Sequence, residues 1–131
     1  MVPILIVDDD ELLREGLCAL LQKNGYFCKA VENGAKAVEW VLSHDVDVVI
    51  TDYQMPEMSG LEFLDCLHHL PIPLSLPVIF MTGNSSEALR QKAKQAGAYT
   101  VLLKPFDTDD LLQRVQEALA FQRSQRQCVL L

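Results

Sequence analysis

The sequence lacks the features of several large classes of protein. No apolar run approaches the ~20 residues of a membrane-spanning helix. The four cysteines form no CxxC pair, and their spacing is not that of metal ligands. Neither a GxGxxG loop nor a GxxxxGKS/T loop occurs, so the glycine-rich phosphate cradles of many nucleotide-binding proteins are missing. These absences argue against a membrane protein and a structural zinc site.

Positive charge is also scarce. Lys and Arg together number 11 against 18 Asp and Glu, which gives a formal net charge of -7 at pH 7. This balance argues against direct nucleic acid binding and against docking on acidic membranes, because both need clustered Lys and Arg. No basic segment precedes the first apolar run, so we expect no secretory signal peptide. Free cysteines within apolar patterns suit a reducing compartment, and we expect a cytoplasmic protein.

The hydrophobic residues, which make up 50% of the chain, follow two alternating patterns. Short apolar runs rich in β-branched residues predict strands that are buried on both faces. Between them, apolar residues spaced three and four apart predict amphipathic helices. The expected strands are 3–7, 26–31, 46–51, 78–82 and 99–103, and the expected helices are 11–24, 35–43, 61–70, 87–95 and 109–123.

Strands that alternate with helices imply a parallel sheet covered on both faces and joined by right-handed crossovers. We therefore predict an α/β fold of five βα units, forming one domain over residues 1–121, with residues 122–131 as a C-terminal tail or the start of a linker. The second strand mixes polar and apolar residues, which predicts a place at the sheet edge. The inward residues expected in the second and third helices are Val38, Val41 and Leu42, then Leu61, Leu64 and Leu67 or Cys66.

Charged and polar residues follow the apolar runs at one edge of this predicted sheet. These residues are Asp8, Asp9, Asp52, Thr82 and Lys104. Because the carboxyl ends of parallel strands meet at the same edge, we expect these side chains to share one cleft. Carboxylates crowded together in a low dielectric repel one another, and they stay ionised only with a cation among them. Oxygen ligands alone point to Mg²⁺, with Mn²⁺ possible, rather than to zinc.

Asp52 is the candidate nucleophile of this cleft. A metal ion, the Lys104 ammonium and the Thr82 hydroxyl would surround it, and phosphoryl transfer depends mostly on such positioning and charge neutralisation. A carboxylate is itself able to act as the nucleophile and to form an aspartyl phosphate. The residues therefore predict phosphoryl transfer onto Asp52.

Four motifs resemble, in order, the receiver domain of bacterial two-component response regulators. They are VDDD at 7–10, TDYQMPEMSG at 51–60, MTG at 81–83 and KPF at 104–106. The resemblance covers residue 3 to about residue 120 and implies a flavodoxin-like three-layer sandwich with strand order 2-1-3-4-5. It also implies a switch that takes its phosphoryl group from a phosphohistidine on a sensor histidine kinase or a phosphotransfer protein.

The resemblance implies a role for each matching acidic residue. Asp52 would accept the phosphoryl group. Asp9 and Asp52 would bind Mg²⁺ directly, while Asp8 would hold a metal-bound water. The backbone carbonyl of Gln54 would complete the metal site. The only catalysis expected of the chain is its own phosphorylation and autodephosphorylation.

The resemblance also implies how the signal leaves the site. Lys104 would pair with the carboxylate and then with the phosphoryl oxygens, and its bond to the following proline is usually cis in the family. Thr82 would donate a hydrogen bond to the phosphoryl group. The fourth helix, fifth strand and fifth helix would then form the surface for an output partner, an output domain or a second copy.

One position departs from the family pattern. The family usually carries an aromatic residue three positions before the lysine, and this chain has Val101 there. A valine has no ring to swing inward when Thr82 moves, so the usual coupling between the two positions is in question. Tyr99 lies two residues earlier, where alternation along a strand predicts the same face. It either replaces the missing ring or simply packs, and we favour packing.

Two other classes of function stay open at this point. The first is a phosphorylation-independent interaction module with the same fold, which only Val101 favours. The second is a flavin- or nucleotide-binding enzyme of flavodoxin-like fold, against which the missing glycine-rich loops argue.

Overall fold

The computed structural model describes residues 3–72, 76–84 and 86–130, with side chains up to residue 124. The strands are β1 (Pro3–Val7), β2 (Phe27–Val31), β3 (Val48–Asp52), β4 (Val78–Thr82) and β5 (Thr100–Leu103). The helices are α1 (Glu11–Lys23), α2 (Gly34–Ser43), α3 (Gly60–His68), α4 (Glu87–Gln95) and α5 (Thr108–Leu130). All strand pairs are parallel, in the order β2-β1-β3-β4-β5, so the predicted flavodoxin-like fold and its strand order are confirmed.

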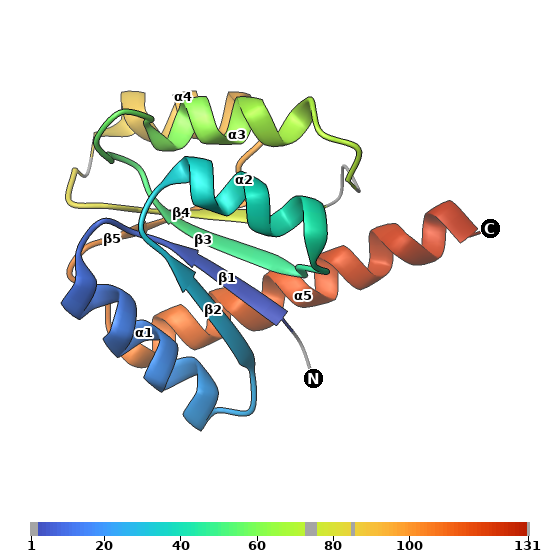
Figure 1. Cartoon of the computed structure of the whole chain (residues 1–131), viewed down its shortest axis with the longest axis horizontal. Coiled ribbons are helices and arrows are strands. Elements are labelled where there is room, and N and C mark those ends of the chain that lie inside the picture. The colour runs from blue at the N-terminus through green and yellow to red at the C-terminus, as the bar shows by residue number, and fades with distance from the viewer. Residues whose placement is uncertain (1–2, 73–75, 85, 131) are drawn as a thin grey trace.

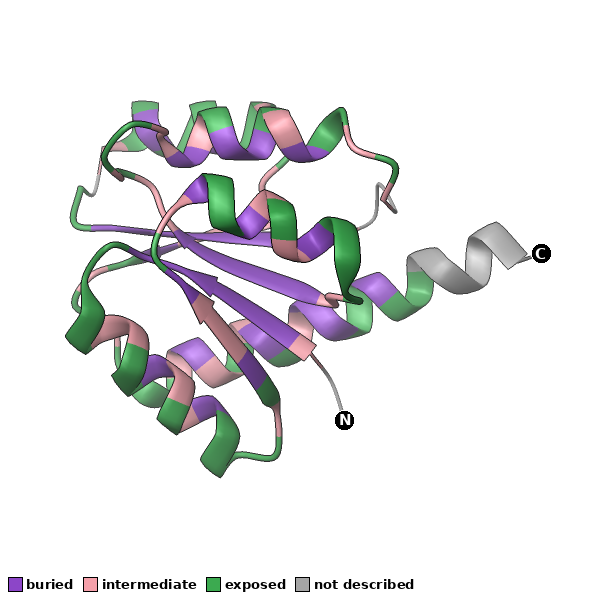
Figure 2. Ribbon diagram, viewed as in Figure 1, coloured by how far each residue is buried: buried purple, intermediate pink, exposed green. Residues whose placement is uncertain are grey.

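Helices cover both faces of the sheet, with α1 and α5 on one face and α2, α3 and α4 on the other (Figure 1). Along β1, Ile4 and Ile6 belong to the hydrophobic cluster on the α1 and α5 side, while Leu5 and Val7 belong to the opposite cluster. The central strands are therefore buried on both faces, as Figure 2 shows in purple. This double burial explains why their apolar runs do not alternate with polar residues.

Local chemistry sets where the helices begin and end. The Asp10 carboxylate accepts hydrogen bonds from two backbone N–H groups in the first turn of α1. Ser59 and Glu62 form a capping box at the start of α3. Gly25 and Gly97 follow α1 and α4 with φ of 89° and 102°, a left-handed conformation that ends helices and favours glycine.

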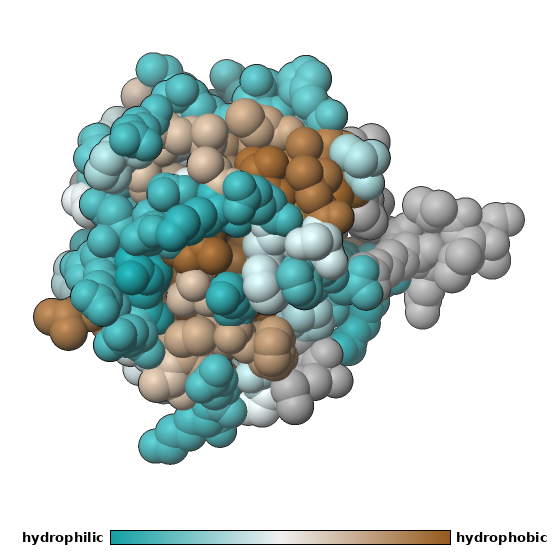
Figure 3. Space-filling view, viewed as in Figure 1, coloured by the Kyte–Doolittle hydropathy of each residue, from teal (hydrophilic) through white to brown (hydrophobic). Residues whose placement is uncertain are grey.

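Two predicted helix faces need correction. Leu42 was expected inward but is 52% exposed, because it lies about 100° around the helix from Val41, which faces the core together with Ala37. Leu42 and Val41 line a hollow beside the C-terminal end of α2, where Figure 3 shows a hydrophobic area. In α3, Phe63 is fully buried although it was not predicted, while the expected Leu61 is only half-buried.

The fifth helix continues beyond the predicted domain boundary at residue 121. Gln122 is buried, and its Nε2 donates a hydrogen bond to Asp47 Oδ1 at 3.3 Å. Asp47 lies in the connection between α2 and β3, so this bond ties α5 to the body of the domain. Within the described ranges, no helix combines the length and apolar character needed to span a membrane.

Candidate functional site

Three carboxylates gather at the carboxyl ends of β1 and β3. Asp8 and Asp9 follow β1, and Asp52 is the last residue of β3. The two strands are neighbours in register, with Val7 paired to Thr51, so the residues that follow also lie side by side. One oxygen from each of the three carboxylates lies within 4.8 Å of the other two. The structure thus brings together the acids expected in one cleft.

Asp8 is the buried member of this cluster. Its Oδ1 accepts a hydrogen bond from the Asp10 N–H at 2.8 Å. Its Oδ2 has no hydrogen-bond partner among the described residues and lies 3.6 Å from Lys104 Nζ. Burial raises the pKa of Asp8, opposed by the Asp10 hydrogen bond and the Lys104 charge and assisted by the charges of Asp52 and Asp9. A buried carboxylate oxygen without a hydrogen bond is suited to bind a cation or an ordered water.

Lys104 reaches the same cluster from the end of the edge strand β5. Its Nζ lies 3.5 Å from Asp52 Oδ2, and 28% of its side chain is exposed. It follows β5, which is separated from β3 by β4, so its long stem crosses the end of β4 to reach Asp52. Lys104-Pro105 is the cis peptide bond that the family resemblance implied.

Thr82 ends β4 and therefore lies between the strands that carry Asp52 and Lys104. Its Oγ1 accepts a hydrogen bond from the Asn84 N–H at 3.1 Å. No hydrogen bond joins Thr82 to Asp52 in the part of the chain that the structure describes. Because a hydroxyl also donates, Thr82 keeps a donor for a further acceptor at this edge.

The loop after β3 holds Asp52 in place. The Gln54 N–H donates to Asp52 Oδ1 at 3.3 Å, so the predicted metal-site residue contacts Asp52 through its backbone. Gly60 lies beneath this loop, and a Cβ there would be 2.8 Å from the Asp52 carbonyl oxygen. Close packing against this loop therefore requires glycine at position 60.

Arg14 is a site neighbour that sequence reasoning missed. Its Nη1 donates a hydrogen bond to the backbone carbonyl of Asp8 at 2.9 Å. This bond joins α1 to the loop that carries Asp8 and Asp9. The sequence holds no signal for it, because the acceptor is a backbone atom that any residue would supply.

Val101 and Tyr99 lie against opposite sides of the sheet, so the expectation that they share a face was wrong. Val101 packs against the cluster on the α4 side, and Tyr99 packs against the cluster on the α5 side. The Tyr99 ring lies 5.3 Å from the Phe121 ring, measured between centroids. Tyr99 precedes the first residue of β5, so strand alternation does not govern it. The preferred interpretation of Tyr99 as a packing residue is confirmed.

The acidic cluster suits a small, hard divalent cation. Its donors are carboxylate oxygens, and one of them is buried without a hydrogen bond in the described part of the chain. Mg²⁺ and Mn²⁺ favour such oxygen ligands and keep water in their remaining positions. The half-buried Asp52 and the exposed Asp9 leave room for that water.

Comparison with known proteins identifies the family to which this fold belongs. A family model of the response regulator receiver domain matches residues 4–116. The DNA-binding transcriptional regulator NtrC of Escherichia coli strain K12 is 37% identical over 124 residues, which is 95% of this chain and 26% of that protein. Response regulator MprA of Mycobacterium sp. strain KMS is 35% identical over 118 residues, which is 90% of this chain and 50% of that protein. Chemotaxis protein CheY4 of Vibrio cholerae has a TM-score of 0.87 at 31% identity and covers 91% of this chain and 99% of its own.

The fold and the acidic edge together define a two-component signalling domain. The chain belongs to the response regulator receiver domain family. It spans 26% of NtrC and 50% of MprA, so what those whole proteins do is not carried over to it.

Proposed function

We propose that this chain is a phosphorylation-dependent switch whose phosphoacceptor is Asp52. The donor would be a phosphohistidine on a sensor histidine kinase or a phosphotransfer protein, in the cytoplasm. One observation carries the proposal. Asp52 ends the central strand with a lysine ammonium 3.5 Å from its carboxylate and two further acids within 4.8 Å. That combination suits a carboxylate that must accept a phosphoryl group with several negative oxygens.

In this mechanism a carboxylate oxygen of Asp52 attacks phosphorus in line with the bond to the donor imidazole. The phosphorus–nitrogen bond breaks, and its electron pair returns to the ring nitrogen. The Gln54 N–H and the Lys104 ammonium already contact the two oxygens of Asp52, so the carboxylate is oriented before the donor arrives. The Lys104 ammonium then pairs with the phosphoryl oxygens, and the Thr82 hydroxyl donates a hydrogen bond to one of them.

Mg²⁺, or Mn²⁺, would be held by Asp9 and Asp52, by Asp8 through a water, and by the backbone carbonyl of Gln54. When bound, the ion supplies positive charge that offsets the repulsion between the carboxylates and the phosphoryl oxygens. The buried Asp8 Oδ2, which has no hydrogen-bond partner among the residues that the structure describes, supports this assignment. Burial is the main cause of the raised pKa of Asp8, and a bound cation would favour the charged form of this carboxylate.

Phosphorylation would change the surface formed by α4, β5 and α5, which we call the output face. Moving a two-state domain from 1:99 to 99:1 needs about 5.5 kcal/mol of differential stabilisation. Hydrogen bonds to charged groups contribute about 1.5–3 kcal/mol each, so the Lys104 and Thr82 contacts supply much of this. The Lys104 N–H donates to the Thr82 carbonyl at 2.6 Å, which couples the ends of β4 and β5. This backbone link needs no aromatic ring at Val101.

The output face would bind an output partner, an output domain or a second copy of the chain. α4 buries only Leu89 and Ala93, and such light packing lets a helix shift at low cost. A phosphorylation-independent interaction module remains the second candidate function. Val101 favours it, because the usual aromatic relay to the output face is missing.

Intact mass spectrometry after incubation with acetyl phosphate tests the proposal. The wild type should gain one phosphoryl group in the presence of Mg²⁺ and none with EDTA. Asp52→Asn should gain none, whereas Asp45→Asn, at an exposed acid outside the cluster, should behave as the wild type does. A folded wild type that gains nothing under any condition would favour the phosphorylation-independent module.

A further inference from the structure

Hydrogen bonds hold Asp8 at three of its four polar groups. Its N–H donates to the Val31 carbonyl at the end of β2 at 3.1 Å, and its Oδ1 accepts from the Asp10 N–H at 2.8 Å. Its carbonyl accepts from Arg14 Nη1 at 2.9 Å, and among the described residues no other donor bonds to that carbonyl. The fourth group, Oδ2, has no hydrogen bond within the described ranges. Asp8 is therefore fixed everywhere except at the oxygen that would face a metal-bound water.

Arg14 bonds to the loop of residues 8–10 through both its backbone and its side chain. It lies near the start of α1, where its N–H donates to the Asp10 carbonyl at 2.9 Å. Its guanidinium donates to the Asp8 carbonyl from the same helix. The exposed Asp9 lies between these two anchored residues and contributes an oxygen to the acidic cluster. A change in the path of this loop would therefore move the Asp9 carboxylate as well as that of Asp8.

The charge of Arg14 is not what neutralises the acidic cluster. Lys104 Nζ lies 3.6 Å from Asp8 Oδ2, whereas the Arg14 guanidinium donates to the Asp8 backbone. Lys36 lowers the pKa of Glu32 through a hydrogen bond and through its charge, and the Arg14 charge lowers it further. The ionised Glu32, which follows β2 outside the cluster, therefore attracts Arg14 in its turn.

We propose that Arg14 is a positioning residue of the metal site. By holding the Asp8 carbonyl, it keeps the loop of residues 8–10 in the conformation in which Asp8 and Asp9 meet Asp52. A buried carbonyl that loses its donor must find water instead, so the loop would turn and carry both carboxylates with it. Loss of a residue that orients metal ligands typically weakens metal binding by about 10–100-fold.

This role rests on the proposed function, because the Mg²⁺ that Arg14 would help to hold is the ion that would serve phosphorylation of Asp52. Two possible roles of Arg14 predict changes of opposite sign. If Arg14 were only a positive charge near the acids, its removal would strengthen Mg²⁺ binding, because like charges repel. If Arg14 positions the loop, its removal weakens Mg²⁺ binding although a repulsive charge is lost. The sign of the change therefore decides between the two roles.

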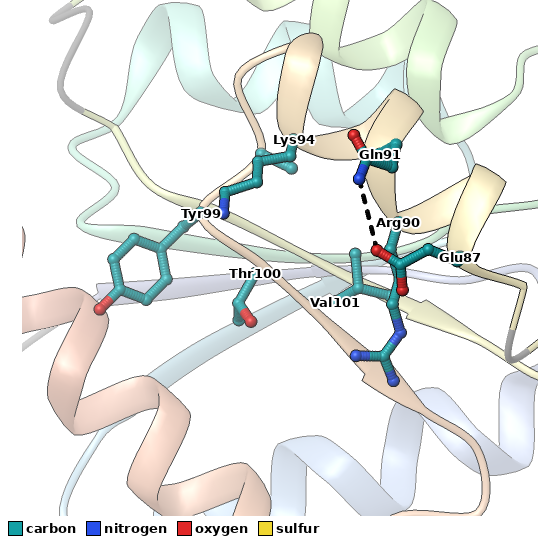
Figure 4. A pocket seen from close by; sticks show the side chains of 8 residues that line it. Glu87, Arg90, Gln91, Lys94, Tyr99, Thr100 and Val101 are labelled. Carbon is teal, nitrogen blue, oxygen red and sulfur yellow. Dashed lines mark hydrogen bonds between the residues drawn. The ribbon is translucent and has the colours of Figure 1, made fainter.

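The test is a Mg²⁺ titration of the isotope-labelled full chain, followed by NMR. Arg14→Ala should raise the dissociation constant about tenfold. Arg14→Lys keeps a charged donor on a long stem and should recover part of the affinity. The matched control is Arg90→Ala, since Arg90 lines a hollow between α4 and β5, on the opposite face of the sheet from α1 (Figure 4). That change should alter the dissociation constant by less than about twofold, because solvent and salt screen a distant exposed charge.

A second measurement needs no metal. In the Mg²⁺-free protein, the Asp10 N–H should exchange with water roughly two- to tenfold faster in Arg14→Ala than in the wild type, because the loosened loop weakens its bond to Asp8. The Asn84 N–H is the internal reference, because it makes a similar bond to Thr82 in the loop after β4. Its exchange should not change.

Unchanged or tighter Mg²⁺ binding in Arg14→Ala would overturn the proposal, and so would unchanged exchange at Asp10. Equally faster exchange at Asp10 and Asn84 would also overturn it, because Arg14 would then support only the general stability of the domain. A wild type that binds no Mg²⁺ would overturn it too. By contrast, a wild type that binds Mg²⁺ but gains no phosphoryl group from acetyl phosphate would overturn the proposed function and not the role of Arg14.

Discussion

Replacing Gly60 by alanine should damage both the stability of the domain and the geometry of Asp52. Gly60 is the buried first residue of α3. A Cβ there would lie 2.8 Å from the Asp52 carbonyl oxygen, 2.9 Å from Phe80 Cε1 and 3.0 Å from Tyr53 Cα. Two of these three atoms belong to the backbone of the loop that carries Asp52. A side chain can rotate away from a new methyl group, but this backbone can yield only by moving the site.

The size of the effect follows from two opposing terms. Overpacking a closed site by one methyl group costs about 1–3 kcal/mol. Alanine regains up to about 1 kcal/mol over glycine in a helix interior, and less at the first position of a helix. We therefore expect Gly60→Ala to lower the free energy of unfolding by about 1–2 kcal/mol. The matched control is Gly16→Ala in the exposed middle of α1, where a Cβ meets nothing within 4 Å. That change should stabilise the fold by roughly 0.5–1 kcal/mol.

Urea unfolding of the two variants and the wild type measures both values. The signs should be opposite, with the midpoint lower for Gly60→Ala and higher for Gly16→Ala. Phosphorylation of Asp52 by acetyl phosphate should slow in the first variant and stay unchanged in the second. A Gly60→Ala protein as stable and as reactive as the wild type would refute the argument from close packing.

Three further changes test separate parts of the structure by urea unfolding. Asp8→Asn should raise stability at pH 7 without Mg²⁺, because burial raises the pKa of Asp8. A carboxyl with a raised pKa in the folded state stabilises the fold at a pH below its ordinary pKa, and this stabilisation is lost as the pH rises through the pKa of the folded state. A variant that gains no stability at pH 7 relative to acidic pH would contradict this. Gln122→Ala should cost about 1–2 kcal/mol through its lost hydrogen bond and packing, and no loss would mean that α5 contributes nothing beyond residue 121. Ser59→Ala should cost about 1 kcal/mol by removing the α3 capping box, whereas Ser43→Ala at the end of α2 should cost less.

The predictable part of the fold is the part encoded by local pattern. Apolar runs located all five strands, and the ends of these runs located the acidic edge, because parallel strands must end together. β3 was expected to end at Thr51 and ends one residue later at Asp52, which leaves the cluster unchanged. The resemblance supplied the strand order, which periodicity alone does not determine.

What escaped prediction depends on partners that are distant in the sequence. Leu42 is exposed although burial was expected, and Phe63 is buried although it was not predicted. Which residues of a helix face the core depends on how that helix lies on the sheet. Gln122 is polar, so apolar spacing could not mark it as buried, and its partner is 75 residues away. Arg14 contacts a backbone carbonyl of Asp8 that no side-chain pattern reveals.

Locating the phosphoryl group on a single residue is the most direct test of the central claim. After treatment with acetyl phosphate and Mg²⁺, sodium borohydride reduces an aspartyl phosphate to homoserine, and peptide mass mapping then finds the altered position. The account predicts homoserine at Asp52 alone. Homoserine at Asp8 or Asp9, or no conversion in a folded and Mg²⁺-loaded protein, would contradict it.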